Sequence, residues 1–271
     1  RYTLRLLTSD QAGRLVRAVG AMNKVAERNG IGVQQGFSPF RVGNWVGEKS
    51  TPNRFFVHPE FKSEGSKRVQ AILDKANANE ELGDCSVVQF QTCPWCGDDS
   101  IGDPRRYQIE HLHWTGGKPT LSVNCSNQDC EFHDWMPFTC VDEDIYLNPP
   151  TILLGTADKF VQIANNHWPK SLKHSADYKE YYSEEFSIRR LLGFEKGYGG
   201  PDPPDLIIQD ELHLLSGPLG TIAGLVETAL SVVWKEACGH EPKYVAATAT
   251  IRGAERDVGL MYGKKLNVFP P

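Results

Sequence analysis

The sequence lacks any hydrophobic run of the length that a membrane-spanning helix needs, about 20 apolar residues in succession. Its first residues, from Arg1 to Leu7, do not have the pattern of a secretory signal, and they include no starting Met. Internal repeats and low-complexity tracts are also missing. These absences predict a cytoplasmic, membrane-free protein, and we expect the chain to be a fragment of a longer one.

An excess of positive charge is missing as well, because 29 Lys and Arg stand against 34 Asp and Glu, a net charge of −5. Nucleic acid would therefore have to bind a local basic patch rather than the chain as a whole. Hydrophobic residues make up 40% of the chain and charged residues 23%, which is ordinary for a globular protein. The length suits one large domain or two small ones.

Cysteine is distributed unevenly, with six of the seven residues between Cys85 and Cys140. An odd total together with this clustering favours metal binding in a reducing compartment over a disulfide framework. We interpret residues 85–140 as a zinc-ribbon insertion between two parts of a lobe, residues 1–84 and 141–271.

Two cysteine pairs in this insertion have the spacing of a zinc site: Cys93 with Cys96, and Cys125 with Cys130. Four thiolates satisfy the tetrahedral preference of Zn²⁺ and close its shell, so the predicted zinc is structural rather than catalytic. A redox Cys-x-x-C motif is the alternative for the first pair. Other residues compete as ligands, and His133 could replace Cys130; they are Cys85, Cys140, His111, His113 and His133.

Outside the insertion, short apolar runs alternate with amphipathic stretches, a pattern typical of an α/β fold with a mainly parallel sheet. The expected strands cover residues 2–7, 40–46, 151–155, 206–208 and 244–247. The expected helices cover residues 8–26, 66–78, 156–165 and 186–192, and a long one capped by Ser216. That last helix should face the core with Leu219, Ile222, Val226, Ala229 and Val233.

An acidic pair, Asp210-Glu211, follows the apolar run Leu206-Ile207-Ile208-Gln209. In a parallel sheet, ligands sit outside the carboxyl ends of the strands. Nucleotide hydrolysis needs one carboxylate to hold Mg²⁺ and a second group to orient the attacking water, and these roles fit Asp210 and Glu211. An acidic pair alone would more often be a solvated turn, but His213 follows at once. Thr248 and Thr250, after a separate strand, are suited to bind that histidine or a carboxylate.

The strings "DELH" and "TAT" resemble motifs II and III of superfamily 2 DExH-type helicases. "GTADK", residues 155–159, is similar to the motif that touches the tracking strand. "RYTLRLLTSDQAGRL" sits where motif Ia belongs. The longer strings "PDLIIQDELHLLSGPLGTIAGLVE", "GNWVGEKSTPN" and "CPWCG" resemble the branch that contains the large helicase subunit of the DISARM anti-phage system and related bacterial helicases.

This resemblance implies a RecA-like P-loop NTPase lobe that uses ATP with Mg²⁺ held by Asp210. It implies contacts from Thr156, Lys159 and Arg5 to nucleic acid, with DNA favoured over RNA. It further implies a second RecA lobe of the same protein and a possible partner subunit of the defence system. The catalytic set implied is Asp210, Glu211, His213, Thr248 and Thr250.

The phosphate-binding loop of such a motor, Gly-x-x-x-x-Gly-Lys-Ser/Thr, is missing from the chain. The stretch from Gly43 to Ser50 is a near match with the wrong spacing, so we reject Lys49 as a phosphate ligand. Either the loop lies upstream of Arg1 or the lobe is degenerate. Two other interpretations therefore stay open: a non-catalytic scaffold whose zinc ribbon docks a partner, and a zinc-dependent nuclease or redox protein.

Overall fold

The computed structural model describes the chain in two compact units that divide between Thr156 and Ala157. Each unit is considered by itself below. The described residues are 2–32, 38–47, 50–56, 68–156, 159, 204–215, 217–239, 241–248 and 254–269. Within these ranges, none of the helices has the length and apolar character to cross a membrane.

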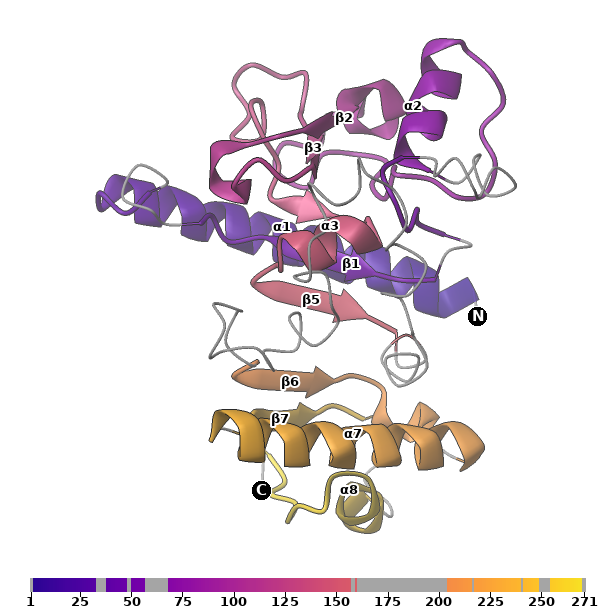
Figure 1. The fold of residues 1–271 in the computed structure, drawn as a ribbon, viewed down its shortest axis with the longest axis vertical. Coiled ribbons are helices and arrows are strands. Elements are labelled where there is room, and N and C mark those ends of the chain that lie inside the picture. Colours follow the sequence, from indigo (N-terminus) through magenta and orange to yellow (C-terminus); the bar gives the residue numbers. More distant parts are fainter. Residues whose placement is uncertain are drawn as a thin grey trace, which may run out of the picture. The chain divides into compact units, whose positions relative to one another are not determined.

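The first unit begins with a long helix, α1 (Tyr2–Arg28), shown in indigo in Figure 1. The predicted strand over residues 2–7 is therefore wrong, and Thr8 lies inside the helix rather than at its cap. Leu and Arg are good helix formers, and no Gly or Pro interrupts the chain before Gly13. The helix ends as predicted before Gly30, whose φ of 72° suits the left-handed turn after a helix.

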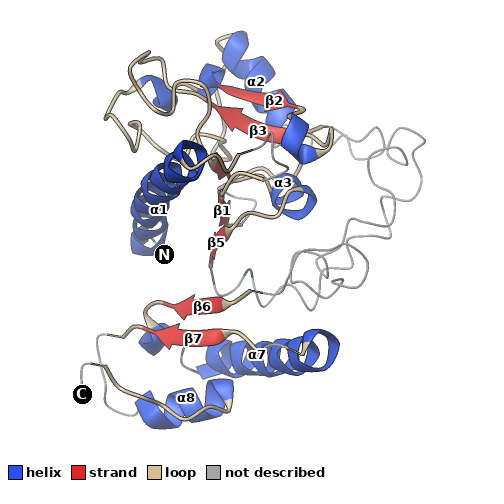
Figure 2. Cartoon of the chain, turned by 90° about the vertical axis from the view of Figure 1, so that its left-hand side faces the viewer, coloured by secondary structure: helices blue, strands red, loops and turns tan. Residues whose placement is uncertain are grey.

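A parallel sheet of three strands follows: β1 (Val42–Trp45), β4 (Phe138–Thr139) and β5 (Ile152–Gly155), in the order β4-β1-β5. The predicted strands 40–46 and 151–155 are confirmed as β1 and β5. Helix α1 lies on one face of this sheet and the short helix α3 (Asp142–Leu147) on the other, as Figure 2 shows. Every side chain of β1 is buried, so this strand is central to the unit.

Between β1 and β4 the chain forms helix α2 (Val69–Asn77) and the antiparallel pair β2 (Tyr107–Glu110) and β3 (Thr120–Val123). Three single turns of 3-10 helix complete this region: Ser100–Gly102, Pro104–Arg106 and His113–Thr115. Helix α2 confirms the predicted helix over 66–78 as far as the described residues reach.

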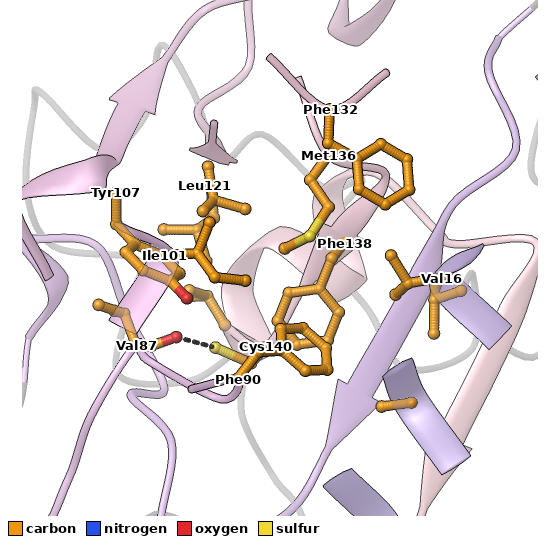
Figure 3. Packing of buried hydrophobic residues seen from close by; sticks show 14 of the residues in the cluster. Val16, Val87, Phe90, Ile101, Tyr107, Leu121, Phe132, Met136, Phe138 and Cys140 are labelled. Carbon is orange, nitrogen blue, oxygen red and sulfur yellow. Dashed lines mark hydrogen bonds between the residues drawn. The ribbon is translucent and has the colours of Figure 1, made fainter. Parts of the chain in front are cut away.

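One hydrophobic core joins α1 and the sheet to the region that contains the cysteines. Figure 3 shows Val16 of α1 beside Phe132 and Phe138, with Phe90 and Met136 in the same cluster. The ring of Phe90 packs edge-on against Phe138, with their centroids 4.8 Å apart. The segment 85–140 thus shares its core with α1 rather than having one of its own.

The second unit pairs β6 (Leu206–Gln209) with β7 (Lys243–Ala246) in parallel, next to helices α7 (Gly217–Cys238) and α8 (Ala254–Tyr262). The strands were predicted correctly, but their burial was not. Ile207 packs against Leu230 and Trp234 of α7, whereas the exposed fractions of Leu206 and Ile208 are 48% and 66%. Among the described residues, helices cover only one face of this short sheet.

Helix α7 also faces the core with a different stripe from the predicted one. Ala223, Leu230 and Trp234 are buried, while Ile222 is 46% exposed and Ala229 is exposed. Val226 is half-buried, and the side chains of Leu219 and Val233 lie outside the described residues. The predicted helices over 156–165 and 186–192 fall almost wholly outside the described residues, and so does the Ser216 cap.

Candidate metal centre and strand-end carboxylates

The four predicted cysteines lie together in the first unit. Their sulfur atoms are all within 4.8 Å of one another, although 29 residues separate Cys96 from Cys125 in sequence. Cys93 and Cys96 lie on a turn closed by the N–H of Gly97, which donates to the Cys93 carbonyl at 2.9 Å. Gly97 has a φ of 82°, a conformation that a side chain would strain.

The spacing of the sulfurs fits a tetrahedral metal ion. The Sγ atoms of Cys93 and Cys130 are 3.7 Å apart, and those of Cys96 and Cys125 are 3.6 Å apart. Zn–S bonds of about 2.3 Å would place sulfurs about 3.8 Å apart at the corners of a tetrahedron. A disulfide would need about 2.05 Å. These four residues could therefore hold a metal ion such as zinc.

Backbone N–H groups point at these sulfurs and stabilise their thiolate forms. The N–H of Phe132 donates to the Sγ of Cys130 at 3.4 Å. Burial raises the pKa of Cys125 to about 11, although the backbone N–H of Asn127 opposes this shift. Burial also raises the pKa of Cys96, but the Asp98 N–H and neighbouring thiols outweigh it and leave that pKa below its usual value.

Three other candidate ligands contact backbone carbonyl oxygens rather than the cysteine sulfurs. The Nδ1 of His133 is 3.1 Å from the carbonyl oxygen of Cys125, and the Nδ1 of His111 is 2.7 Å from that of Gly117. Cys140 is buried, with its Sγ 3.6 Å from the carbonyl oxygen of Val87 (Figure 3). None of these residues belongs to the group that brings four ligand atoms together among the described residues.

A carboxylate and two hydroxyls surround Cys125 and were not predicted from the sequence. Asp98 accepts hydrogen bonds from the Ser100 N–H at 2.9 Å and the Ser126 hydroxyl at 3.2 Å. The Ser100 hydroxyl lies 4.0 Å from the Cys125 sulfur. Outer partners of this kind orient metal ligands. The only sequence signal is that each serine or aspartate stands within four residues of a predicted ligand.

The predicted residues of the second unit gather where β6 and β7 end. Asp210 accepts the Glu211 N–H at 2.9 Å, and the carboxylate of Glu211 lies 3.2 Å from the Nδ1 of His213. The Thr248 hydroxyl is 3.5 Å from the same nitrogen. Glu211 has the left-handed backbone angles φ 50° and ψ 47°, which are uncommon for a residue other than glycine.

The ends of the two strands are tied together by backbone hydrogen bonds. The Ala247 N–H donates to the Gln209 carbonyl at 2.8 Å, and the Leu212 N–H donates to the Ala247 carbonyl at 3.0 Å. Parallel pairing places Gln209 opposite Ala246, so both carboxyl ends meet at one edge. Strand β5 belongs to the other unit, so its end is not placed relative to this edge.

The remaining predicted contacts are only partly described. Thr156 follows β5 directly, and Lys159 is 5% exposed. The side chain of Arg5 and the whole of Thr250 lie outside the described residues. Gly43 lies in β1, so the stretch from Gly43 to Ser50 begins as a strand, unlike a phosphate-binding loop; Lys49 itself is outside the described residues.

No protein-family model matches this chain. The chain is similar to a bacterial protein, the DISARM protein DrmA of Bacillus paralicheniformis (strain ATCC 9945a / NCIMB 11709 / CD-2), with 33% identity over 288 aligned residues. The alignment covers all of this chain but 24% of DrmA, so the chain spans about a quarter of the length of that relative. The predicted relationship to a DISARM protein is thereby confirmed.

Proposed function

We propose that this chain is part of an ATP-dependent superfamily 2 motor, a helicase or translocase that acts on DNA. The observation that carries the proposal is the contact of Glu211 with His213, and of His213 with Thr248, at the ends of two parallel strands. A carboxylate at the carboxyl end of a parallel strand, joined through a histidine to the next strand, is the arrangement that such a motor needs. Backbone angles uncommon for a non-glycine residue, as at Glu211, cluster at functional sites.

Each residue of this group has a distinct role in the proposal. Asp210 would hold Mg²⁺, which neutralises the phosphate charge that develops during hydrolysis. Glu211 orients and polarises the attacking water. His213 passes the nucleotide state to the strand-binding surface through Thr248 and Thr250, while Thr156, Lys159 and Arg5 contact the nucleic-acid backbone.

The partners follow from the same proposal. ATP hydrolysis needs a phosphate-binding loop and a second RecA lobe, which we place in other parts of the protein. The similarity to a DISARM protein supports a role in anti-phage defence, together with partner subunits of that system. The four cysteines would hold a structural zinc, because four thiolates leave no open position for a substrate or water.

Two substitutions in the complete protein distinguish ATP hydrolysis itself from its stimulation by DNA. Glu211→Gln should keep ATP binding but slow hydrolysis on the order of 100-fold, the scale for loss of a general base. His213→Ala should retain part of the basal hydrolysis and lose most of its stimulation by DNA, because the path to Thr248 is broken. Steady-state ATPase assays with and without single-stranded DNA measure both effects.

A matched control is Glu255→Gln, since Glu255 is exposed at the start of helix α8 and has no role in the proposal. Its ATPase activity should equal that of the parent. If Glu211→Gln hydrolysed ATP at the parental rate, the acidic pair would be only a solvated turn. The chain would then be a scaffold that uses its zinc ribbon to dock a partner.

A further inference from the structure

Helix α1 packs directly against the ring of Phe132, which lies between the helix and the cysteine cluster. Phe132 packs so closely on α1 that a Cβ built on Gly20 would lie 2.5 Å from its ring. Trp95 packs edge-on against Phe132, with centroids 5.4 Å apart. Val16 and Val19, on the same side of α1, share the core with Phe132. Phe132 therefore fills the space directly against the helix, and Trp95 packs on Phe132.

Both members of the aromatic pair are fixed by the metal ligands themselves. Trp95 lies in the turn between Cys93 and Cys96. The Phe132 N–H donates to the Cys130 sulfur at 3.4 Å, and its carbonyl accepts the Cys125 N–H at 2.8 Å. Each half of the four-cysteine group thus positions one ring, and the rings touch each other.

Polar contacts between α1 and the same two segments lie beside the aromatic pair. Lys24 forms an ion pair with Glu131 at 3.0 Å, which raises the pKa of the lysine. Arg17 donates to the carbonyl oxygen of Trp95 at 3.3 Å. A separate anchor joins α1 to the chain before β1, where Asn23 exchanges two hydrogen bonds with the backbone of Phe40, at 2.9 and 2.8 Å.

We infer that metal bound at the four cysteines sets the position of helix α1, and that Phe132 transmits this effect through Gly20. This inference rests on the proposed zinc site. Without metal, the two cysteine pairs would be joined by weak thiol contacts and by the hydrogen bonds of Ser126 with Asp98 and Ser100. Phe132 and Trp95 would then be held less firmly than in the metal-bound protein. The Asn23 anchor would remain, so α1 would loosen in the part that packs on the rings.

Coupling between two sites is reciprocal, so a change on α1 must also alter the hold on the metal. Gly20→Ala forces the Phe132 ring to move, because a Cβ there would be 2.5 Å from it. Gly13→Ala is the matched control: its Cβ would meet Phe90 at 3.7 Å, an ordinary contact. Both changes replace a helical glycine by alanine, so they raise the helix propensity of α1 alike.

The experiment measures the zinc affinity of the 271-residue chain by equilibrium competition with a chromogenic chelator. Gly20→Ala should bind zinc on the order of tenfold more weakly than the parent, a typical allosteric coupling. Gly13→Ala should bind it with the parental affinity. Equal affinities for all three proteins would overturn the inference and leave the zinc site standing.

Hydrogen exchange measures the effect of zinc on α1, the reverse of the effect of α1 on zinc. It tests the inference even if Gly20→Ala fails to fold. Zinc removal should raise exchange in α1 peptides around Val16 and Gly20 of the parent. Phe132→Leu keeps the backbone bonds to Cys125 and Cys130, so it should still bind zinc, but zinc removal should no longer change exchange in α1. Unchanged exchange in the parent would contradict the inference, and a parent purified without metal would contradict the zinc site as well.

Discussion

At the scale of single residues, the first unit depends on a buried ion pair between Arg41 and Asp144. The two side chains are 2% and 0% exposed, and an Arg41 nitrogen lies 2.8 Å from an Asp144 oxygen. Asp144 also accepts hydrogen bonds from the Thr120 hydroxyl and from the N–H of Leu121 at 3.0 and 2.9 Å. Arg41 sits over the ring of Trp114, 4.9 Å from its centroid. The network therefore joins the residue before β1 to both α3 and the cysteine-bearing segment.

Removal of Asp144 should strongly destabilise this unit, because Arg41 would be left charged and buried without its partner. We expect Asp144→Ala to lower the free energy of unfolding by about 3–5 kcal/mol in a urea titration. Asp10→Ala is the control, since Asp10 pairs with Arg14 on the exposed face of α1. That change should stay within about 0.5 kcal/mol. A loss at Asp144 no larger than this would contradict the role given to the network.

At the scale of elements, the sequence predicted strands better than it predicted what covers them. Short apolar runs at 151–155, 206–208 and 244–247 were recognisable because they are rich in residues that favour strands and are bounded by turn residues. The strand predicted at 2–7 failed because a strand needs a pairing partner, whereas a helix satisfies its own backbone. The stripe on α7 failed because apolar residues occupy more than one face of that helix, and periodicity alone cannot choose between them.

Helix α7 also carries a carboxyl group that the apolar stripe did not reveal. Burial raises the pKa of Glu227, although the Tyr244 hydroxyl, 3.4 Å away, opposes this shift. A carboxyl with a raised folded-state pKa binds protons more readily in the folded state than in the unfolded state. The contribution of Glu227 to stability is thus fully present below the unfolded pKa of about 4.3 and is lost as pH rises through the folded pKa.

Glu227→Gln should remove this pH dependence, because the amide stays neutral. The variant should match the parent near pH 4 and have a higher melting temperature than the parent at pH 8. Thermal scans at both pH values test this expectation. Glu255→Gln, at an exposed position on α8, should show the same pH profile as the parent. A melting temperature gain for Glu227→Gln that is equal at both pH values would contradict the assignment.

At the scale of the whole molecule, the two candidate sites were predictable to different degrees. The grouping of the four cysteines was predicted from spacing alone, because tetrahedral thiolate coordination restricts both residue type and separation. The contact of His213 with Thr248 was anticipated from the hydroxyl side chains that follow a separate strand. The outer partners Asp98 and Ser100 were missed, since ordinary polar residues near a turn carry no pattern until the fold brings them together.

Because the chain divides into two units, we expect loss of zinc to destabilise the unit that contains the cysteines. Cys96 is exposed while its three partners are buried, so Cys96→Ser removes a ligand with little loss of packing. The freshly purified parent should contain about one equivalent of zinc per chain, and Cys96→Ser should contain far less. Its cysteine-bearing segment should become less stable, because binding energy in such sites contributes to folding, but it should not unfold completely, since it shares its core with α1. Hydrogen exchange should rise in β2 and β3, whereas α7, in the other unit, keeps its protection.

With chelator present, the parent and Cys96→Ser should exchange alike, since neither then holds metal. A parent with less than half an equivalent of zinc, or a difference that persists under chelator, would show that Cys96 acts otherwise than as a ligand.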